Sequence, residues 1–280
     1  MAIKIASWNI EGRLTRYQGG KKRGTPEQIV KEIAKLNADI VVLPEAYLNE
    51  PLKESSERLK NMGYEWYDVQ YHDTLHDEDV AKWGYPSMRV LYRIPIMSVE
   101  TRRWGNIRNL PVLITEDPET KKKVCIIATH LDDLTEERRL RQLDEIIPFI
   151  QKSDMSVIML GDFNAMWHKG WSRLLTIPFV RFIIDHLMFG GLRNVLSRLS
   201  RMATGTVMER LQEAGLIEAD LHYRATTTPK MRSMPFMPSI RLAQIDHMLV
   251  SKKIVISVPD IGRDAGSDHR SLNASIEVYQ

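Results

Sequence analysis

Polar residues able to do acid–base or metal chemistry follow four short apolar runs of this chain. The runs are Ala2 to Trp8, Ile40 to Leu43, Val124 to Thr129 and Met155 to Leu160, and the polar residues shortly behind them are Asn9, Glu45, His130, Asp162 and Asn164. Apolar runs of this length are typical of buried strands. Polar groups in the loops beyond the carboxyl ends of strands gather at one edge of a sheet. The pattern therefore predicts one site made of carboxylates, amides and an imidazole.

A carboxylate and an imidazole near the end of the chain are expected to pair. Asp246 lies in the apolar stretch Ala243 to Val250, where an ionised carboxylate needs a hydrogen-bonded or charged partner. His269 is the candidate partner, because a carboxylate that holds an imidazole fixes its tautomer and stabilises its charged form. Asp268 is then free to face a metal ion. Taken without the other motifs, Asp246 also fits a purely structural buried pair.

Six segments around these residues resemble motifs of the endonuclease/exonuclease/phosphatase superfamily, which contains DNase I, exonuclease III and the neutral sphingomyelinases. They are SWNIEG from Ser7, LPEA from Leu43, ATHLDD from Ala128, GDFNA from Gly161, QIDHMLVS from Gln244 and SDHR from Ser267. All six occur in the family's order and together span almost the whole chain. The resemblance implies an α/β fold, the DNase I-like four-layer α/β sandwich of two packed mixed β-sheets flanked by helices.

Two positions bear on the branch of the superfamily. His130 places the likeness nearer to the DNase I, sphingomyelinase and tyrosyl-DNA phosphodiesterase branches than to exonuclease III, which lacks a histidine there. Pro44 departs from the family, which usually has glutamine before the metal-binding glutamate, and this affects the surroundings of Glu45 rather than the ligand itself. The acidic partner that this histidine has in DNase I is not placed by any motif of the chain.

The resemblance also implies a role for each site residue. The residues that would surround the metal are Asn9, Glu45 and Asp268, and those that would carry catalysis are His130, Asp162, Asn164, Asp246 and His269. In this scheme Asp162 and Asn164 position the attacking water and the phosphate, while Asp246 orients a positive His269. Ligands that offer only hard oxygen donors suit Mg²⁺, with Mn²⁺ as a substitute. Such an ion polarises the phosphoryl group for in-line attack by water, without a covalent enzyme intermediate.

Basic residues indicate how a polyanionic substrate would be held. The formal net charge is only +3, but basic groups are concentrated after Asn9 and between residues 171 and 241, whereas residues 45 to 79 are acidic. The candidate substrate-binding residues are Arg13, Arg16, Lys22 and Arg232. Clustered cations of this kind attract a phosphate backbone. A solvated loop rich in glycine is the alternative interpretation of the residues after Asn9.

Three hypotheses for function follow from these patterns. The first is a metal-dependent nuclease or nucleic-acid phosphodiesterase. The second is a lipid or small-molecule phosphoesterase of the sphingomyelinase or phosphatase type. The third is a nucleic-acid-binding member that has lost activity, against which all six motifs retain their chemical groups. One site chemistry serves many substrates on this fold, so the motifs do not choose among the first two.

Length and composition fit one domain over residues 1–280, with a helical insertion at about 170–215. At 280 residues and 43% hydrophobic residues, the chain can bury a sizeable core, and the candidate site residues run from Asn9 to His269. Cys125 is the one cysteine and falls in an apolar run, which favours a reducing, cytoplasmic setting. The first residues lack the pattern of a cleaved signal, and no apolar run has the length of a membrane span.

Further elements are predicted between the motifs. A helix is expected from Pro26, and another from Glu136 to Lys152 that Pro148 should kink or split. Arg89 to Ser98 is interpreted as two strands broken at Ile94-Pro95, and the strand before Asp162 is expected to stop at Gly161 in a sharp turn. Ile177 to Ala203 interleaves apolar and arginine residues, which fits a helix packed on the core or, alternatively, a lid or lipid-facing arm.

Overall fold

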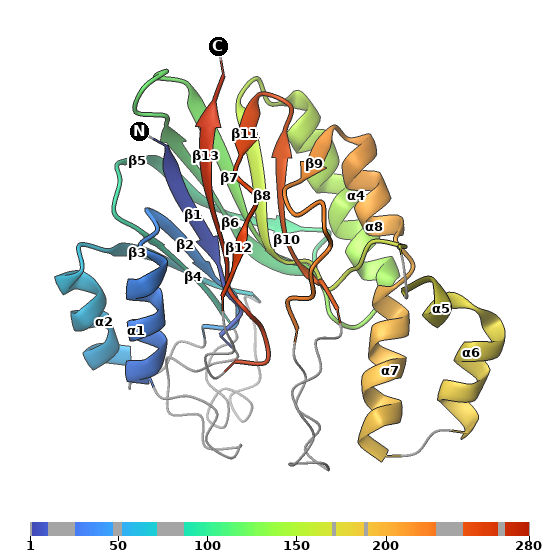
Figure 1. Cartoon of the computed structure of the whole chain (residues 1–280). Coiled ribbons are helices and arrows are strands. Elements are labelled where there is room, and N and C mark those ends of the chain that lie inside the picture. Colours follow the sequence, from blue (N-terminus) through green and yellow to red (C-terminus); the bar gives the residue numbers. More distant parts are fainter. Residues whose placement is uncertain are drawn as a thin grey trace.

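Two β-sheets pack face to face at the centre of the molecule, and helices cover their outer faces (Figure 1). The structure is a computed structural model that describes residues 2–10, 26–46, 52–71, 87–169, 172–187, 190–227, 243–262 and 267–279. The order of layers is helix, sheet, sheet, helix, which is the four-layer α/β arrangement that the resemblance implies. Each layer buries one apolar face against the next.

The first sheet has the strand order β11-β13-β1-β2-β4-β3, with β12 paired to β13. Its strands are β1 (Ile3–Ser7), β2 (Ile40–Leu43), β3 (Glu65–Gln70), β4 (Ser87–Tyr92), β11 (Ile254–Ile256), β12 (Asp260–Ile261) and β13 (Leu272–Val278). Within this sheet β1 and β2 are parallel, and the other described pairs are antiparallel. The loops that follow β1 and β2 therefore leave the sheet at the same edge.

The second sheet has the strand order β5-β6-β7-β8-β10-β9. Its strands are β5 (Ile96–Trp104), β6 (Arg108–Glu116), β7 (Lys123–His130), β8 (Ser156–Asp162), β9 (Leu216–Glu218) and β10 (Asp246–Ser251). Here β7 and β8 are the parallel pair, and β10 runs antiparallel to β8. The carboxyl ends of β7 and β8 thus meet the amino end of β10.

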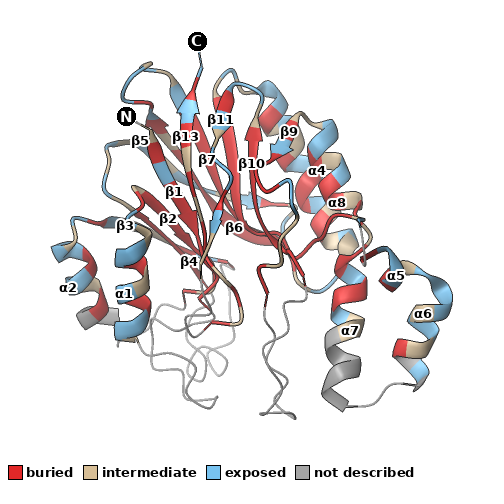
Figure 2. Cartoon of the chain, viewed as in Figure 1, coloured by how far each residue is buried: buried red, intermediate tan, exposed pale blue. Residues whose placement is uncertain are grey.

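Burial explains why the central strands are apolar on both faces. Ile40 and Val42 of β2 face the space between the sheets, whereas Val41 and Leu43 pack beneath α1 (Pro26–Leu36) and α2 (Leu52–Asn61). The other outer face is covered by α4 (Glu136–Lys152) and α8 (Thr206–Glu213). A strand covered on both faces needs a continuous apolar run. Figure 2 shows these strands as the buried centre of the molecule.

Two local predictions met different outcomes. The segment Arg89 to Ser98 does split, since β4 ends at Tyr92 and β5 begins at Ile96. Pro148 does not split its helix, which runs unbroken from Glu136 to Lys152. Leu143, Ile146 and Ile150 on this helix are buried against the second sheet. Tertiary packing of that apolar face outweighs the hydrogen bond that a proline inside a helix removes.

The chain between residues 170 and 215 forms several short helices. They are α5 (Ser172–Thr176), α6 (Pro178–Phe182), the π-helix η1 (Ile183–Leu187), α7 (Gly190–Met202) and α8. Of these, α5, α6 and α7 stand off at the lower right of Figure 1 and join the body through a small apolar cluster around Met166, Leu175 and Ile184. Within the described ranges, no helix is both long and apolar enough to cross a membrane.

Candidate active site

Three candidate site residues form one row across the second sheet. His130 is the last residue of β7 and pairs with Asp162, the last residue of β8. Asp162 in turn pairs with Asp246, the first residue of β10. Side chains of directly paired residues project from the same face of a sheet. The strand register alone therefore gathers two carboxylates and an imidazole that are far apart in the sequence.

The first sheet adds an amide and a carboxylate to this row. Asn9 follows β1 and Glu45 follows the parallel neighbour β2. The amide nitrogen of Asn9 donates to Oε1 of Glu45 and to Oδ2 of Asp162, both at 3.0 Å. Asn9 is fully buried, so its amide group links the ends of the two sheets in the interior.

Two site residues hold a backbone conformation that L-residues seldom adopt. Glu45 has a φ of 53° and Asn164 a φ of 47°, both in the left-handed region. Such residues cluster at functional sites because the surrounding structure enforces them. In each case the left-handed residue lies two positions after the last residue of a strand. The conformation turns the chain at that point and fixes where the side chain points.

Gly161 is required for a reason other than the turn predicted from the sequence. Strand β8 does not stop at Gly161 but continues through Asp162. Gly161 has a φ of 145°, and a Cβ built there would lie 1.9 Å from the carbonyl oxygen of Thr129. Only glycine permits this close approach of β7 and β8. The approach is what places His130 beside Asp162.

The turn that carries Asp268 and His269 is tied to the end of β1. The indole nitrogen of Trp8 donates to the carbonyl oxygen of His269 at 3.0 Å. The hydroxyl of Ser267 donates to the carbonyl oxygen of Asn9 at 2.7 Å and accepts from the backbone N–H of His269 at 3.1 Å. Residues from the two ends of the chain are thereby held in one unit.

His269 is oriented by Asp246. Its Nδ1 lies 2.8 Å from Oδ2 and 3.1 Å from Oδ1 of that carboxylate. Its Nε2 faces Oδ2 of Asp162 at 3.8 Å and Oδ1 of Asp268 at 3.9 Å. Burial acts to lower the pKa of His269, but the carboxylate of Asp246 raises it more, so the pKa lies well above its usual value. At neutral pH this imidazole is positively charged and keeps Nε2 for another acceptor.

His130 is held by the hydroxyl of a tyrosine. The hydroxyl of Tyr71 lies 2.7 Å from Nδ1 of His130 and accepts from the backbone N–H of Glu45 at 2.9 Å. The bond between the hydroxyl and Nδ1 can run in either direction, but the carboxylates that face Nε2 favour the tautomer with its proton on Nε2. That Nε2 points toward Glu45 and Asp162, at 3.7 and 3.8 Å from their carboxylate oxygens.

The pKa values of His130 and His269 are shifted in opposite directions. Burial lowers the pKa of His130 well below its usual value, and the nearby Arg108 guanidinium lowers it further. Arg108 also lies over the ring of Tyr71, 5.2 Å from the ring centroid. At neutral pH His130 is a neutral N–H donor, whereas His269 is a cation. No motif marks Tyr71 in the sequence; its one signal is its place directly after β3.

Asp162 occupies the centre of the arrangement. Burial raises its pKa to about 6, although the charge of His269 acts to lower it. Its Oδ1 accepts from the backbone N–H of Asn164 at 2.8 Å. The side-chain nitrogen of Asn164 donates to the carbonyl oxygen of Leu131 at 3.0 Å, and its Oδ1 is buried without a partner among the described residues. That oxygen is an acceptor suited to a water molecule.

The donor set fits a hard divalent cation. Glu45, His130 and Asp162 offer ligand atoms within 4.8 Å of one another, and so do Asp162, Asp246 and His269. Burial raises the pKa of Glu45 to about 7, although a quarter of its side chain stays exposed. Crowded carboxylates with raised pKa values are the setting that a bound dication would relieve. Asp268 belongs to neither close group, and its side chain is 31% exposed beside His269.

Four predicted substrate-binding residues lie outside the described residues. They are Arg13, Arg16, Lys22 and Arg232. Every predicted metal or catalytic residue is described, and the structure brings Asn9, Glu45, His130, Asp162, Asn164, Asp246, Asp268 and His269 to the same edge of the two sheets.

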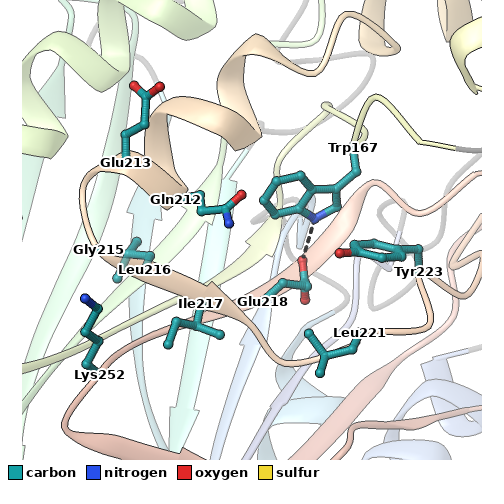
Figure 3. A pocket seen from close by; sticks show the side chains of 10 residues that line it. All are labelled: Trp167, Gln212, Glu213, Gly215, Leu216, Ile217, Glu218, Leu221, Tyr223 and Lys252. Atoms are coloured by element: carbon teal, nitrogen blue, oxygen red, sulfur yellow. Dashed lines mark hydrogen bonds between the residues drawn. The ribbon is translucent and has the colours of Figure 1, made fainter.

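A second buried imidazole–carboxylate pair, which the sequence does not predict, lies beside the site. Nδ1 of His247 lies 2.6 Å from Oε2 of Glu218, and Nε2 lies 2.9 Å from the carbonyl oxygen of Ala165. The indole of Trp167 donates to the same Glu218 oxygen at 3.3 Å, and both side chains line the pocket that Figure 3 shows. Burial acts to lower the pKa of His247, but Glu218 raises it more.

Comparison with known proteins extends over nearly the whole chain. The model of the "Endonuclease/Exonuclease/phosphatase family" matches residues 6–269. No curated protein sequence matches the chain.

Among solved structures, the human Nocturnin catalytic domain with bound sulfate anion is 16% identical with a TM-score of 0.61, over 99% of this chain and 94% of that one. ANGEL2, a 2',3'-cyclic phosphatase in complex with adenosine-2',3'-vanadate, is 16% identical with a TM-score of 0.65, over 100% and 96%. A mannosyl-6-phosphatase from Bacteroides thetaiotaomicron is 14% identical with a TM-score of 0.59, over 98% and 99%. These likenesses concern the fold.

Proposed function

The chain belongs to the endonuclease/exonuclease/phosphatase family, and on that premise we propose that it is a metal-dependent phosphoester hydrolase that uses in-line attack by water. The observation that carries the proposal is the row of His130, Asp162 and Asp246, joined to Glu45 through Asn9. One sheet supplies acid–base groups, and the other supplies oxygen ligands beside them. No nucleophilic side chain is required by this arrangement.

The proposed metal ligands are Asn9, Glu45 and Asp268. Their oxygen donors suit Mg²⁺, or Mn²⁺ in its place. When bound, such an ion polarises a phosphoryl oxygen and neutralises charge on the leaving oxygen. The raised pKa of Glu45, about 7 without a metal, supports this assignment because a cation would favour the ionised carboxylate.

The remaining residues would orient water and stabilise the phosphate. Asp162, with a pKa of about 6, is mostly ionised at neutral pH and can accept a hydrogen bond from the attacking water, assisted by Asn164. His269 would donate from Nε2 as a cation held by Asp246. His130 would donate from Nε2 as a neutral imidazole. Together the two imidazoles would stabilise the charge that grows on the phosphoryl oxygens in the transition state.

For the substrate we propose a nucleic acid, cleaved by nuclease or phosphodiesterase action. Support comes from the basic residues Arg13, Arg16, Lys22 and Arg232 in the sequence. ANGEL2 in complex with adenosine-2',3'-vanadate supports nucleotide chemistry on this fold. A small phosphate ester or a lipid is the second candidate, because the fold is shared with a mannosyl-6-phosphatase. An inactive binding protein is the third, and the retained set of catalytic groups opposes it.

We further propose that the chain forms a single domain and works in a reducing, cytoplasmic setting. The match over residues 6–269 supports one domain, with the helices between 170 and 215 as an insertion. The buried free thiol of Cys125, whose pKa burial raises to about 12, supports a reducing cytoplasmic setting, since it is not poised for disulfide exchange.

The test is hydrolysis by the purified chain in Mg²⁺. Supercoiled plasmid, single-stranded RNA and a phosphate monoester are offered separately, with EDTA and the variant Asp162→Ala as controls. The proposal predicts cleavage of a nucleic acid that both controls abolish. Cleavage of the monoester alone would move the assignment to the second candidate, and folded protein without metal-dependent activity on any substrate would refute hydrolysis.

A further inference from the structure

The short helices α5 and α6 present an apolar surface to solvent. Leu174, Ile177, Phe179 and Phe182 are exposed, Phe179 to 70% and Phe182 to 53%. The opposite side of the same segment is anchored, because Leu175 is buried in the small apolar cluster that also contains Met166 and Ile184. We call residues 172–182 with these four side chains the apolar arm. Its inner face holds it to the body, and its outer face has no covering layer among the described residues.

The concentration of exposed apolar side chains is particular to this segment. The other large apolar side chains that are exposed in the described chain are scattered over seven positions: Met97, Leu134, Ile217, Leu221, Val255, Val258 and Tyr279. Single exposed apolar residues are ordinary on protein surfaces, whereas a contiguous patch marks an interaction site. In the apolar arm, four exposed apolar side chains fall within nine residues of one segment.

Charge identifies the partner. From residue 166 to residue 208 the sequence has one acidic residue, Asp185, and six basic ones: Lys169, Arg173, Arg181, Arg193, Arg198 and Arg201. Arg173 and Arg181 lie on the apolar arm and are exposed. Aromatic and aliphatic side chains flanked by arginine match a bilayer interface, where apolar groups enter the acyl boundary and cations meet phosphate head groups.

We propose that the apolar arm docks on an anionic phospholipid surface. Phe179 and Phe182 insert at the head-group boundary, while Arg173 and Arg181 contact lipid phosphates. A nucleic acid would satisfy the arginines but offers little to exposed Leu174 and Ile177, so lipid is the better match. The inference concerns the arm and does not depend on the proposed hydrolysis.

The place of the arm gives this docking a consequence for the site. The cluster that anchors the arm includes Ala243 and Ile245, which lead directly into Asp246, and Met166, which follows Asn164 closely. The arm projects on the same side as the strand ends that carry the site (Figure 1). Docking would therefore hold the catalytic edge close to the membrane surface.

The test is co-sedimentation of the whole chain with vesicles in EDTA, which prevents metal-dependent hydrolysis. One set of vesicles is phosphatidylcholine and the other contains phosphatidylglycerol as well. The wild type is expected to bind the anionic vesicles more tightly. The double variant Phe179→Ser/Phe182→Ser should lose about tenfold or more in affinity, and Arg181→Glu should lose binding chiefly on the anionic set.

The matched control is Val258→Ser, which removes an exposed apolar side chain from outside the arm and should bind as the wild type does. Circular dichroism shows whether each variant is folded. Three outcomes would overturn the proposal: no binding to anionic vesicles, binding that the double variant retains, or self-association of the wild type that the double variant abolishes in sedimentation velocity while vesicle binding is absent.

Discussion

Two buried imidazole–carboxylate pairs, Asp246 with His269 and Glu218 with His247, differ in what the second ring nitrogen contacts. Asp246 and His247 are neighbours at the start of β10, so their side chains leave opposite faces of the strand. On one face Asp246 holds His269, whose Nε2 faces carboxylates of Asp162 and Asp268 at 3.8 and 3.9 Å. On the other face His247 bonds Glu218 with one nitrogen and the carbonyl of Ala165 with the other.

The difference lies in the second nitrogen. Both ring nitrogens of His247 form hydrogen bonds to the protein. These bonds hold the loop after Asn164 against β9, which stabilises the fold. In His269, Nδ1 bonds to Asp246, whereas Nε2 points toward Asp162. A charged imidazole whose Nε2–H still points into the site is suited to stabilise a substrate anion. Whether a buried histidine is structural or functional is thus decided by its second partner rather than by burial.

The largest expected effect comes from removing the acceptor that His269 faces. Asp162→Asn keeps the shape of the side chain but cannot act as a base, so kcat should fall about a thousandfold or more. Steady-state hydrolysis in Mg²⁺ measures this loss. Since the pKa of Asp162 is raised to about 6, the ionised carboxylate opposes folding above that pH. The free energy of unfolding of the variant in EDTA should therefore equal or exceed that of the wild type at pH 8.

Near-normal turnover by this variant would remove Asp162 from the proposed mechanism. A large loss of stability would instead show that Asp162 stabilises the fold, as we expect of the pair of His247 and Glu218.

Breaking the structural pair should give the reverse result. His247→Gln leaves Glu218 buried without its cation, which costs about 3 kcal/mol of unfolding free energy. Hydrolysis per folded molecule should stay close to that of the wild type, because His247 faces away from the row. Urea unfolding and activity at saturating substrate are the two measurements. The matched control is His222→Gln, an exposed histidine, which should change neither.

Removing the hydroxyl of Tyr71 tests how much kcat depends on the orientation of His130. Tyr71→Phe removes the hydroxyl that bonds His130 and accepts from Glu45, and kcat should fall about tenfold. Tyr64→Phe is the matched control, since Tyr64 donates to the carbonyl of Ala38 at 2.7 Å away from the site. That control should lower stability slightly and leave kcat unchanged. Equal effects of the two variants on kcat would refute a role for Tyr71 in positioning.

The smallest expected effect is the pH dependence of the structural pair. The pKa of His247 is raised in the folded state above its usual value of 6.5. Its stabilisation is therefore fully present below about pH 6.5 and is lost as the pH rises through the raised pKa. The stability gap between the wild type and His247→Gln should narrow over that range in urea unfolding. A gap that stays constant or widens with pH would contradict a charged His247.

The sequence predicted the strands that carry the site, because both faces of those strands are covered and they need continuous apolar runs. It also identified His130, Asp162 and Asp246, since each one lies in or shortly after such a run. It did not reveal Tyr71 or the pair of Glu218 and His247, because their partners lie on other strands that only the folded structure brings close.

The same limit explains two smaller differences. Gly161 was assigned to a turn because its real constraint, the carbonyl of Thr129, belongs to another strand. The pattern of Ile177 to Ala203 fits either a helix packed on the core or a lid or lipid-facing arm, and it cannot say that Phe179 and Phe182 remain uncovered while Ile184 is buried. Local patterns define which face is apolar, and only the tertiary structure shows what covers that face.

The most direct test of the whole account compares His269→Gln with His247→Gln. The measurement is kcat/KM for hydrolysis of bis(p-nitrophenyl) phosphate in Mg²⁺, with the concentration of folded protein determined for each variant. The account predicts a loss of about a hundredfold or more for His269→Gln and a value close to wild type for His247→Gln. Equal values for the two variants, or the absence of metal-dependent hydrolysis by the wild type, would contradict it.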